Sequence, residues 1–248
     1  MTGVTRVAHP TVIIGVALLI GGCVGGQGAS STGTPEESQP SAEASVSSSP
    51  LARPLRNQTG TAILDPGTYV LDLFPVNIAF DIPDGEPPGW HVGDSHADSA
   101  IVLWFTPPEI TYEFAFSTAD NVYVDPCNAA AGLIEPPIGP SVDDLVAALL
   151  DLPRFQVTAP VDVTVGAFRG KEIELTALDS GSDCPEVIIF KAGHDDYDIV
   201  PGQTHRLHIL DVDGVPIVMR IIEGAERDAA AEAELHQILD SIRIEPKG

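Results

Sequence analysis

Hydrophobic and polar residues alternate in several short stretches from residue 60 onward. In residues 76–82 every second residue has a large apolar side chain, so these side chains lie on one face of an extended chain. Pro75 and Pro83 bracket the segment. This period of two is typical of half-buried β-strands. Asp213 and Gly214 supply the positive φ values that a tight hairpin turn requires. The pattern predicts further strands at residues 100–105, 111–117, 161–165, 171–177, 207–210 and 215–221, the last two forming the hairpin.

Helix signals are fewer than strand signals. Asp125 followed by Pro126 has the form of an N-cap and a proline at the first helical position. Ser141 is a second N-cap, and acidic residues follow it at the positive end of the helix dipole. We expect helices over residues 126–132, 141–150 and 225–241. The chain therefore reads as an α+β fold, a mostly antiparallel twisted β-sheet flanked by a few helices, in a single domain over residues 60–248.

The first 22 residues have the features of a signal peptide. Arg6 is their single Lys or Arg residue, and the apolar run at 11–20 is about half the length that a membrane-spanning helix needs. The run ends in Ile20-Gly-Gly-Cys23, which resembles the lipobox of bacterial lipoproteins, where the cysteine receives diacylglycerol before cleavage. The resemblance implies lipidation at Cys23. The alternative is an ordinary secretory signal with a chance cysteine.

The segment that follows, residues 23–59, has the composition of a flexible tether. Ser, Gly, Pro, Ala and Glu dominate it, and no aromatic residue occurs before Tyr69. Such a sequence cannot bury enough apolar surface to offset its chain entropy, so we expect disorder. A lipidated cysteine, a disordered linker and a folded domain together predict a protein anchored by lipid at the extracytoplasmic face of the cell membrane.

Composition and charge exclude several classes of protein. The 248 residues carry 12 Lys and Arg against 36 Asp and Glu, a net charge of −24. Such an acidic surface repels phosphate backbones, which argues against a nucleic-acid partner. No apolar run reaches the roughly 18–20 residues of a spanning helix, which excludes a polytopic membrane protein. Three cysteines are too few for a disulfide-rich scaffold.

Two cysteines remain after lipidation. Export places Cys127 and Cys184 in an oxidising compartment, and both lie in turn-rich stretches. A bridge between them closes a loop of roughly 58 residues, which the chain-entropy model values at roughly 4 kcal/mol. We therefore predict a disulfide. The alternative is two free thiols, one of them catalytic, but no Cys/His/Asn signature surrounds either residue.

The order of strands and turns resembles a known family. A turn running from Ile82-Pro83 to Gly89-Trp90, a Gly-rich bend before residues 171–177 and the closing segment 239–244 are similar to the PsbP-like α/β/α sandwich. That group includes an extrinsic photosystem II subunit, a nuclear Ran-binding protein and LpqN-type actinobacterial lipoproteins. The segments at 121–127 and 143–145 also resemble exported actinobacterial proteins. The likeness spans most of residues 62–245 and implies a binding or assembly role without catalysis.

Motifs for catalysis and cofactor binding are absent from the sequence. There is no G-x-S-x-G elbow, no S-x-x-K, no cysteine beside a histidine and no phosphate-binding glycine loop. We therefore expect no enzyme activity and no cofactor. The function expected is that of a lipid-anchored binding or assembly module of the cell envelope, with an unidentified envelope protein or lipid as ligand. An exported hydrolase and a metal-binding envelope protein are the alternatives.

Two sets of side chains are candidate binding sites. His91 and His96 lie in one presumed loop and His194 and Asp196 in another, so the four could hold a metal ion only if the loops met. Because acidic loops are normally solvated, they are weak candidates. Aromatic residues form the second set, a possible ligand face, for which the alternative is a hydrophobic core beneath the helix at 225–241. These residues are Trp90, Tyr112, Phe114 and Phe116.

Overall fold

The computed structural model divides the chain into two units, residues 1–47 and 48–248. The residues that the structure describes all lie in the second unit. They are residues 52–55, 63–72, 74–85, 89–96, 99–106, 109–178, 184, 187–223 and 228–247. Cys23 and the predicted signal peptide lie outside the described residues.

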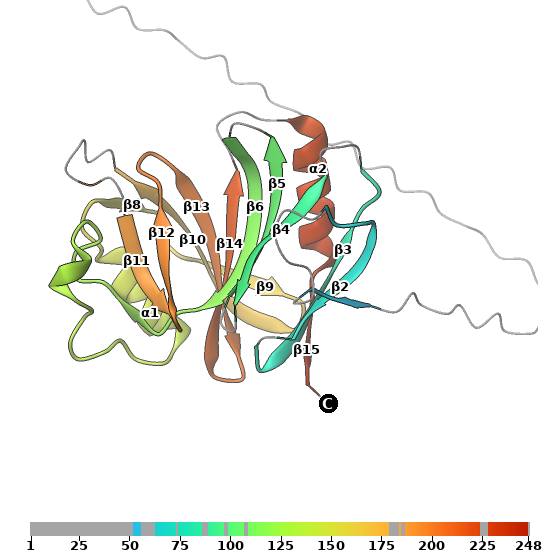
Figure 1. Cartoon of the computed structure of the whole chain (residues 1–248). Helices are drawn as coiled ribbons and strands as arrows, with labels where there is room; N and C mark the ends of the chain where they lie inside the picture. The colour runs from blue at the N-terminus through green and yellow to red at the C-terminus, as the bar shows by residue number, and fades with distance from the viewer. Residues whose placement is uncertain are drawn as a thin grey trace, which may run out of the picture. The chain divides into compact units, whose positions relative to one another are not determined.

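A central eight-stranded sheet organises the folded unit (Figure 1). Its strand order is β4-β5-β6-β14-β13-β10-β8, and β9 also pairs with β10. Every pairing within it is antiparallel, as the short turns between most consecutive strands require. The strands are β4 (Trp90–His96), β5 (Ser99–Thr106), β6 (Glu109–Thr118), β8 (Phe155–Val157), β9 (Val161–Val165), β10 (Phe168–Ala177), β13 (Thr204–Val212) and β14 (Val215–Glu223).

A small sheet and one helix cover the first face of the central sheet. The small sheet has the order β1-β2-β3-β15, and the helix is α2 (Ala229–Ser241). Its strands are β1 (Arg53–Pro54), β2 (Gly67–Leu71), β3 (Val76–Ile82) and β15 (Arg243–Pro246). Asp228 caps α2, because its side chain accepts hydrogen bonds from the backbone amides of Ala230 and Ala231. Strand β1 lies within residues 23–59, the segment that the sequence predicts to be a disordered tether.

A second small sheet and the other helix cover the opposite face. The sheet has the order β12-β11-β7, and the helix is α1 (Val142–Leu150). Its strands are β7 (Asn121–Val122), β11 (Val187–Ala192) and β12 (Asp195–Ile199). Ser141 and Asp144 form a capping box at the start of α1, which explains why this helix begins where the sequence predicts.

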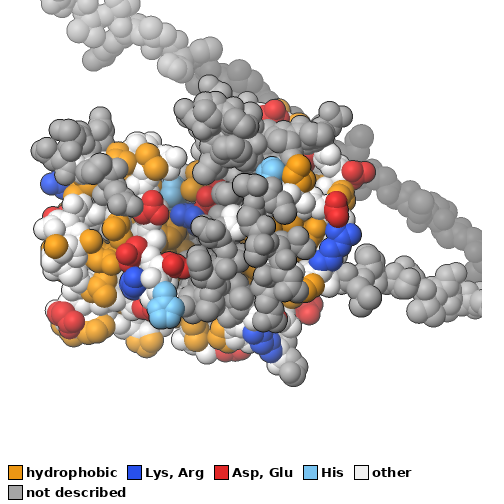
Figure 2. All heavy atoms as spheres, in the orientation of Figure 1, with side chains coloured by type: hydrophobic (Ala, Val, Ile, Leu, Met, Phe, Trp, Pro, Cys, Tyr) orange, Lys and Arg blue, Asp and Glu red, His pale blue; other side chains and the backbone are white. Residues whose placement is uncertain are grey.

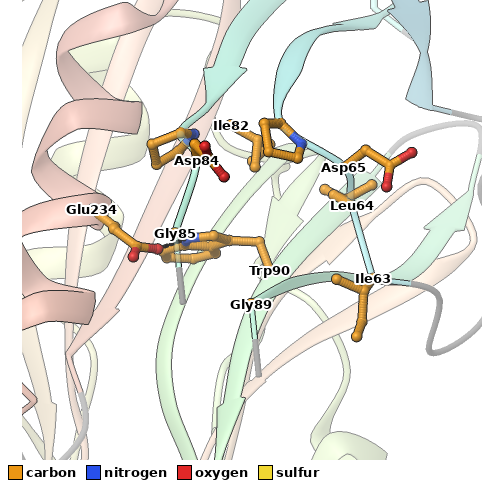
Figure 3. A pocket seen from close by; sticks show the side chains of 11 residues that line it. Ile63, Leu64, Asp65, Ile82, Asp84, Gly85, Gly89, Trp90 and Glu234 are labelled. Atoms are coloured by element: carbon orange, nitrogen blue, oxygen red, sulfur yellow. Dashed lines mark hydrogen bonds between the residues drawn. The ribbon is translucent and has the colours of Figure 1, made fainter. Parts of the chain in front are cut away.

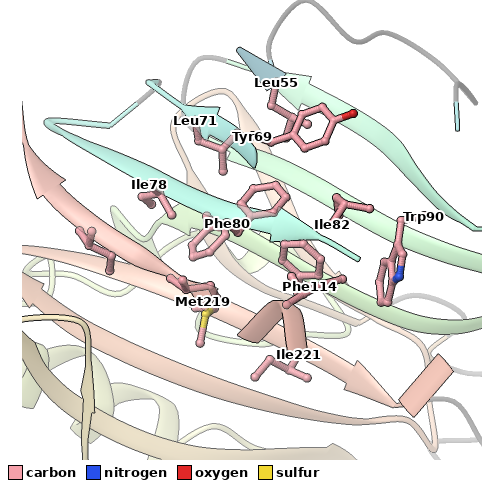
Figure 4. Close-up of a cluster of buried hydrophobic side chains, with 14 of the residues drawn as sticks. Leu55, Tyr69, Leu71, Ile78, Phe80, Ile82, Trp90, Phe114, Met219 and Ile221 are labelled. Carbon is pink, nitrogen blue, oxygen red and sulfur yellow. The ribbon is translucent and has the colours of Figure 1, made fainter. Parts of the chain in front are cut away.

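Alternation along the central strands produces two separate cores. On β14, Met219 and Ile221 point toward α2 and the first small sheet, whereas Val218 points toward α1 and the second. The core on the α2 side, here called the apolar core, contains the aromatic cluster around Phe80 and Phe114 (Figure 4). The core on the α1 side, here called the mixed core, surrounds polar and charged side chains described below.

The expected α+β sandwich is wrong. The described part of the chain forms three sheets and two α-helices, so the fold is mostly β and is not a clear PsbP-like α/β/α arrangement. Two segments account for the difference. The helix expected at 126–132 is reduced to one 3₁₀ turn at Ala129–Ala131, and the acidic loop expected around His194 is largely strand β12, paired with β11.

Candidate ligand pocket

The aromatic residues predicted as a ligand face belong to the apolar core. Tyr112, Phe114 and Phe116 are each 0% exposed, and they pack with residues of α2. Phe114 makes edge-to-face contacts with Phe80 and Phe116, at ring-centroid distances of 5.1 and 6.3 Å. Such contacts stabilise a core but leave no ring face for a ligand. The structure thus corrects the expectation of an open face at these three residues, and it favours the alternative of a core beneath the helix.

Trp90 is also buried, but its surroundings differ. It begins β4, and its ring centroid lies 5.7 Å from that of Phe114. The indole nitrogen donates a hydrogen bond to Oε2 of Glu234 on α2, with a donor–acceptor distance of 3.0 Å. This bond satisfies the polar atom of the buried indole and fixes a carboxylate beside it. Trp90 therefore joins the apolar core to a polar site.

A pocket of about 180 Å³ lies over this Trp90–Glu234 pair (Figure 3). Its described walls are mostly apolar, and they come from the segment before β2, the end of β3 and the start of β4. Asp84 and Glu234 bring carboxylates to it, and Asp65 brings a third from the opposite side. Figure 3 shows Glu234 beside the indole, whereas the carboxylate of Asp65 points away from the pocket. Asp65 lies 3.5 Å from Arg53, measured between Oδ2 and Nη1.

Local sequence explains why the pocket can form. Gly85 packs against Glu234 so closely that any Cβ at this position would overlap the Glu234 carboxylate. Gly89 has a φ of +77°, a left-handed conformation that favours glycine before Trp90. The backbone amide of Leu64 donates to the carbonyl oxygen of Trp90 at 2.7 Å, and Ile63 pairs with His91. These contacts hold the apolar wall against the start of β4.

Within the residues that the structure describes, the weak candidates for metal ligands are not brought together. His91 lies on β4 of the central sheet and Asp196 on β12 of another sheet. Asp196 accepts hydrogen bonds from the Tyr123 hydroxyl at 2.7 Å and from Lys191 at 3.1 Å, and Lys191 also donates to the His194 carbonyl. The side chain of His96 lies outside the described part. Among the described residues, no three His, Cys, Asp or Glu side chains are placed to hold a metal ion.

The predicted disulfide is confirmed. Cys127 and Cys184 are bonded, and their Cα atoms lie 5.1 Å apart, within the range that a disulfide spans. The Cys184 residue is completely buried, and both cysteines pack with the mixed core. The bond therefore ties the segment after β7 to the segment before β11.

A buried polar cluster crosses the mixed core. Arg220 on β14 forms an ion pair with Glu113 on β6, and its guanidinium lies over the ring of Tyr197 on β12, 4.7 Å from the centroid. The Tyr197 hydroxyl lies 2.8 Å from Nδ1 of His205, and Nε2 of that ring lies 3.3 Å from the Gln203 side-chain oxygen. The cluster thus connects the central sheet to β12.

Burial controls protonation in this cluster. Desolvation raises the pKa of Glu113, although the positive charge of Arg220 opposes the shift. Desolvation also raises the pKa of Tyr197, and it lowers the pKa of His205 to about 2, with the charge of Arg220 acting in the same direction. His205 is therefore neutral at pH 7. Because the Gln203 oxygen accepts only, Nε2 carries the ring proton and Nδ1 accepts from Tyr197.

Sequence reasoning identified Trp90 but missed the other residues of the pocket. Glu234 occurs in a helix rich in alanine and glutamate, and nothing in that pattern separates it from the solvated acids beside it. A usable signal is the Pro83-Asp84-Gly85 turn, since a glycine there permits close approach by another element. The residue that approaches Gly85 is Glu234, about 150 positions further along the chain. A local sequence pattern does not indicate so distant a contact.

Comparisons with known proteins assign no family. No family model and no curated protein matches the chain. A crystal structure from Bacteroides thetaiotaomicron VPI-5482 at 1.50 Å resolution is similar, with a TM-score of 0.36 and 11% sequence identity. The match covers 75% of this chain and 50% of that chain, so this chain spans about half the length of its neighbour. In the described residues, no helix is long and apolar enough to cross a membrane.

Proposed function

We propose that the chain is an exported, lipid-anchored protein of the cell envelope whose folded unit binds a ligand without transforming it. Cys23 is the site of lipidation, and residues 1–22 are removed on export. Residues 24 to about 51 connect the anchor to the sheets. The pocket over Trp90 and Glu234 is the binding site.

The Cys127–Cys184 disulfide is the observation that carries this proposal. Disulfides persist in oxidising compartments and are rare in the reducing cytosol. The bond lies in the mixed core and links two strands of one small sheet through their flanking segments. It therefore supports a compartment outside the cytoplasm, which is where an N-terminal segment with the features of residues 1–23 would deliver the protein.

The chemistry of the pocket supports binding in preference to catalysis. The described lining has apolar walls and a few carboxylates, and it includes no Ser, Cys, His or Lys side chain that could act as nucleophile or proton shuttle. Oε2 of Glu234 is engaged by the Trp90 indole. A largely apolar cavity with a few fixed polar groups is the usual form of a small binding site.

Metabolic labelling with an alkynyl palmitate analogue tests the anchor. The wild-type chain should take up label and sediment with membranes, whereas Cys23→Ser should lose the label and remain in the soluble fraction. A Cys127→Ala/Cys184→Ala double variant is the matched control, and it should keep the label because its lipidation site is intact. Equal labelling of wild type and Cys23→Ser contradicts the proposal.

Turnover assays test the absence of catalysis. The purified chain should not cleave ester, phosphoester or peptide substrates above the rate of a Glu234→Gln variant. Activity that co-purifies with the wild-type chain and disappears with that substitution would replace the binding role with that of an exported hydrolase.

A further inference from the structure

We infer that the pocket over Trp90 binds a primary ammonium group carried on a short aliphatic stem. The inference deepens the proposed binding function and rests on it. Its test measures binding by the purified chain, so its failure is distinct from a failure of lipid anchoring, which is measured in cells.

The charge of the lining selects a cation. Three carboxylates border the pocket, and its described lining includes no Lys or Arg side chain. Asp65 is partly neutralised by Arg53 and points outward, so the negative potential inside comes from Asp84 and Glu234. Low-dielectric walls concentrate such a potential within a cavity. An anionic ligand would be repelled by the same two carboxylates.

The geometry of Glu234 provides an acceptor for the ammonium. Its Oε2 accepts the indole N–H of Trp90, which fixes the orientation of the carboxylate. The whole carboxylate packs against Gly85, where the absence of a Cβ lets it lie beside the backbone at the edge of the pocket. A carboxylate has about four lone-pair sites, so one hydrogen bond from Trp90 leaves capacity for a donor from the ligand. Charge-assisted hydrogen bonds of this kind are stronger than neutral ones.

The apolar walls and the size of the pocket define the rest of the ligand. A volume of about 180 Å³ is below the roughly 300–1,000 Å³ of clefts that hold drug-sized molecules. It therefore suits a single side chain or head group. Leu64 and Ile82 are nearly fully buried walls, and Ile63 is 59% exposed beside them. These groups can contact an alkyl stem while its charged end lies near Glu234.

A primary ammonium suits this site better than other cations. A quaternary ammonium has no N–H to donate to the carboxylates, and a guanidinium presents five donors in a rigid planar fork. Two carboxylates on one side of a small cavity match the compact charge and three donors of –NH₃⁺.

The test is a titration of the full chain in detergent, observed through the indole N–H resonances of its two tryptophans. A Trp90→Phe variant assigns the Trp90 signal. The probes are n-butylammonium and the neutral, similarly shaped n-butanol. We expect n-butylammonium to shift the Trp90 signal saturably and to bind about fivefold to tenfold more tightly than n-butanol, with the difference shrinking at high salt.

Three variants localise the binding. Glu234→Gln keeps an acceptor for the indole but removes the charge, and it should weaken n-butylammonium binding about fivefold or more. Gly85→Ala should also weaken it, because the added methyl group displaces the carboxylate without changing any charge. Asp240→Asn removes an exposed carboxylate from the same helix outside the pocket lining, and binding should be unchanged.

Two further probes identify the source of the ammonium. Tighter binding of Nα-acetyl-lysine amide assigns a lysine side chain of a peptide, and tighter binding of glycerophosphoethanolamine assigns a lipid head group. Both results support the inference. Equal binding of n-butanol and n-butylammonium, an unchanged Kd in Glu234→Gln, or no saturable shift of the Trp90 signal would overturn it.

Discussion

The two faces of the central sheet are packed by different chemistry. On the α2 side, the apolar core packs aromatic rings together, and Phe114 contacts both Phe80 and Trp90. On the α1 side, the mixed core contains the Arg220–Glu113 ion pair and the Cys127–Cys184 disulfide among its aliphatic residues. One sheet therefore joins two layers that are stabilised in different ways.

Because of this difference, the two faces should respond differently to pH and to redox conditions. Apolar burial is non-directional and depends little on pH or redox conditions. The apolar core beside the Trp90 pocket should therefore keep its stability when either changes. A buried ion pair and a disulfide depend on both partners and on the state of each. We therefore expect β11 and β12 to respond to acid and to reductants before the elements around the pocket do.

The largest effect is expected in the apolar core. Phe114→Ala removes a ring that is 0% exposed and contacts Phe80, Trp90 and Phe116, so it should lower the free energy of unfolding by about 5 kcal/mol. Chemical denaturation at pH 7.5 measures the loss. Val161→Ala, at a position 60% exposed, is the control and should change it by less than about 0.5 kcal/mol. A loss below about 2 kcal/mol for Phe114→Ala would mean that this core is loosely packed.

The disulfide should come next. Cys127 and Cys184 are separated by 57 positions in the sequence, and replacing both with alanine opens the loop between them. The chain-entropy model predicts that the free energy of unfolding falls by about 4 kcal/mol. Thermal unfolding of the double variant and of the wild-type chain with and without reductant measures it. Reductant should lower the Tm of the wild type alone. An equal shift of Tm in both proteins would show that the reductant does not act through the Cys127–Cys184 bond.

Removing one partner of the ion pair in the mixed core should lower the free energy of unfolding more than removing both partners. Arg220→Met leaves the Glu113 carboxylate buried without its partner and should cost about 3 kcal/mol. Adding Glu113→Gln should recover most of that loss, because no buried charge then remains. A double-mutant cycle supplies the coupling energy, and additive effects would contradict a direct interaction.

A smaller effect should appear as a pH dependence of stability. The pKa of His205 is lowered to about 2 in the folded chain, against about 6.5 when unfolded. Below pH 6.5 the unfolded chain therefore binds a proton that the folded chain excludes, and stability falls as the pH falls. At pH 5.5 the loss is about 1 kcal/mol relative to neutral pH. The raised pKa of Glu113 acts in the opposite direction, since its protonation stabilises the folded chain in acid.

Denaturant titrations at pH 7.5 and 5.5 separate these contributions. His205→Gln should reduce the acid loss by about 1 kcal/mol, whereas replacement of the exposed His194 should leave it unchanged. His208 also has a lowered pKa, chiefly through burial and against the pull of Glu172, and it should account for part of the remainder. An unaltered pH dependence in His205→Gln would contradict a buried neutral imidazole.

Local patterns predicted many individual elements but not the fold class. Alternation located β3 and the β13–β14 hairpin, and Ser141 marked the start of α1, because these signals act within a few residues. Proline at 126 suggested a helix, yet the segment holds the disulfide at Cys127 and makes only a 3₁₀ turn after it. Which layer covers which face depends on contacts far apart in sequence, and no local pattern encodes these.

The candidate site was predictable only in part. Trp90 attracted attention as a rare aromatic residue near a turn, but its bond to Glu234 joins positions 144 residues apart. Tyr112, Phe114 and Phe116 share a face, as alternation requires, but alternation alone does not show whether that face is a surface or a core covered by α2. The burial of Glu113 and Arg220 was missed because charged residues on a strand ordinarily mark its solvated side.

Native-state hydrogen exchange of the full chain, read by mass spectrometry with and without a reductant, tests the division between the two faces most directly. Peptides covering α1, β11 and β12 should exchange faster after reduction, through partial opening of the mixed core. Peptides covering β3, β4 and α2, which border the pocket, should keep their protection. If the pocket peptides lose protection together with β11 and β12, or before them, the two faces unfold as one unit and the account is contradicted.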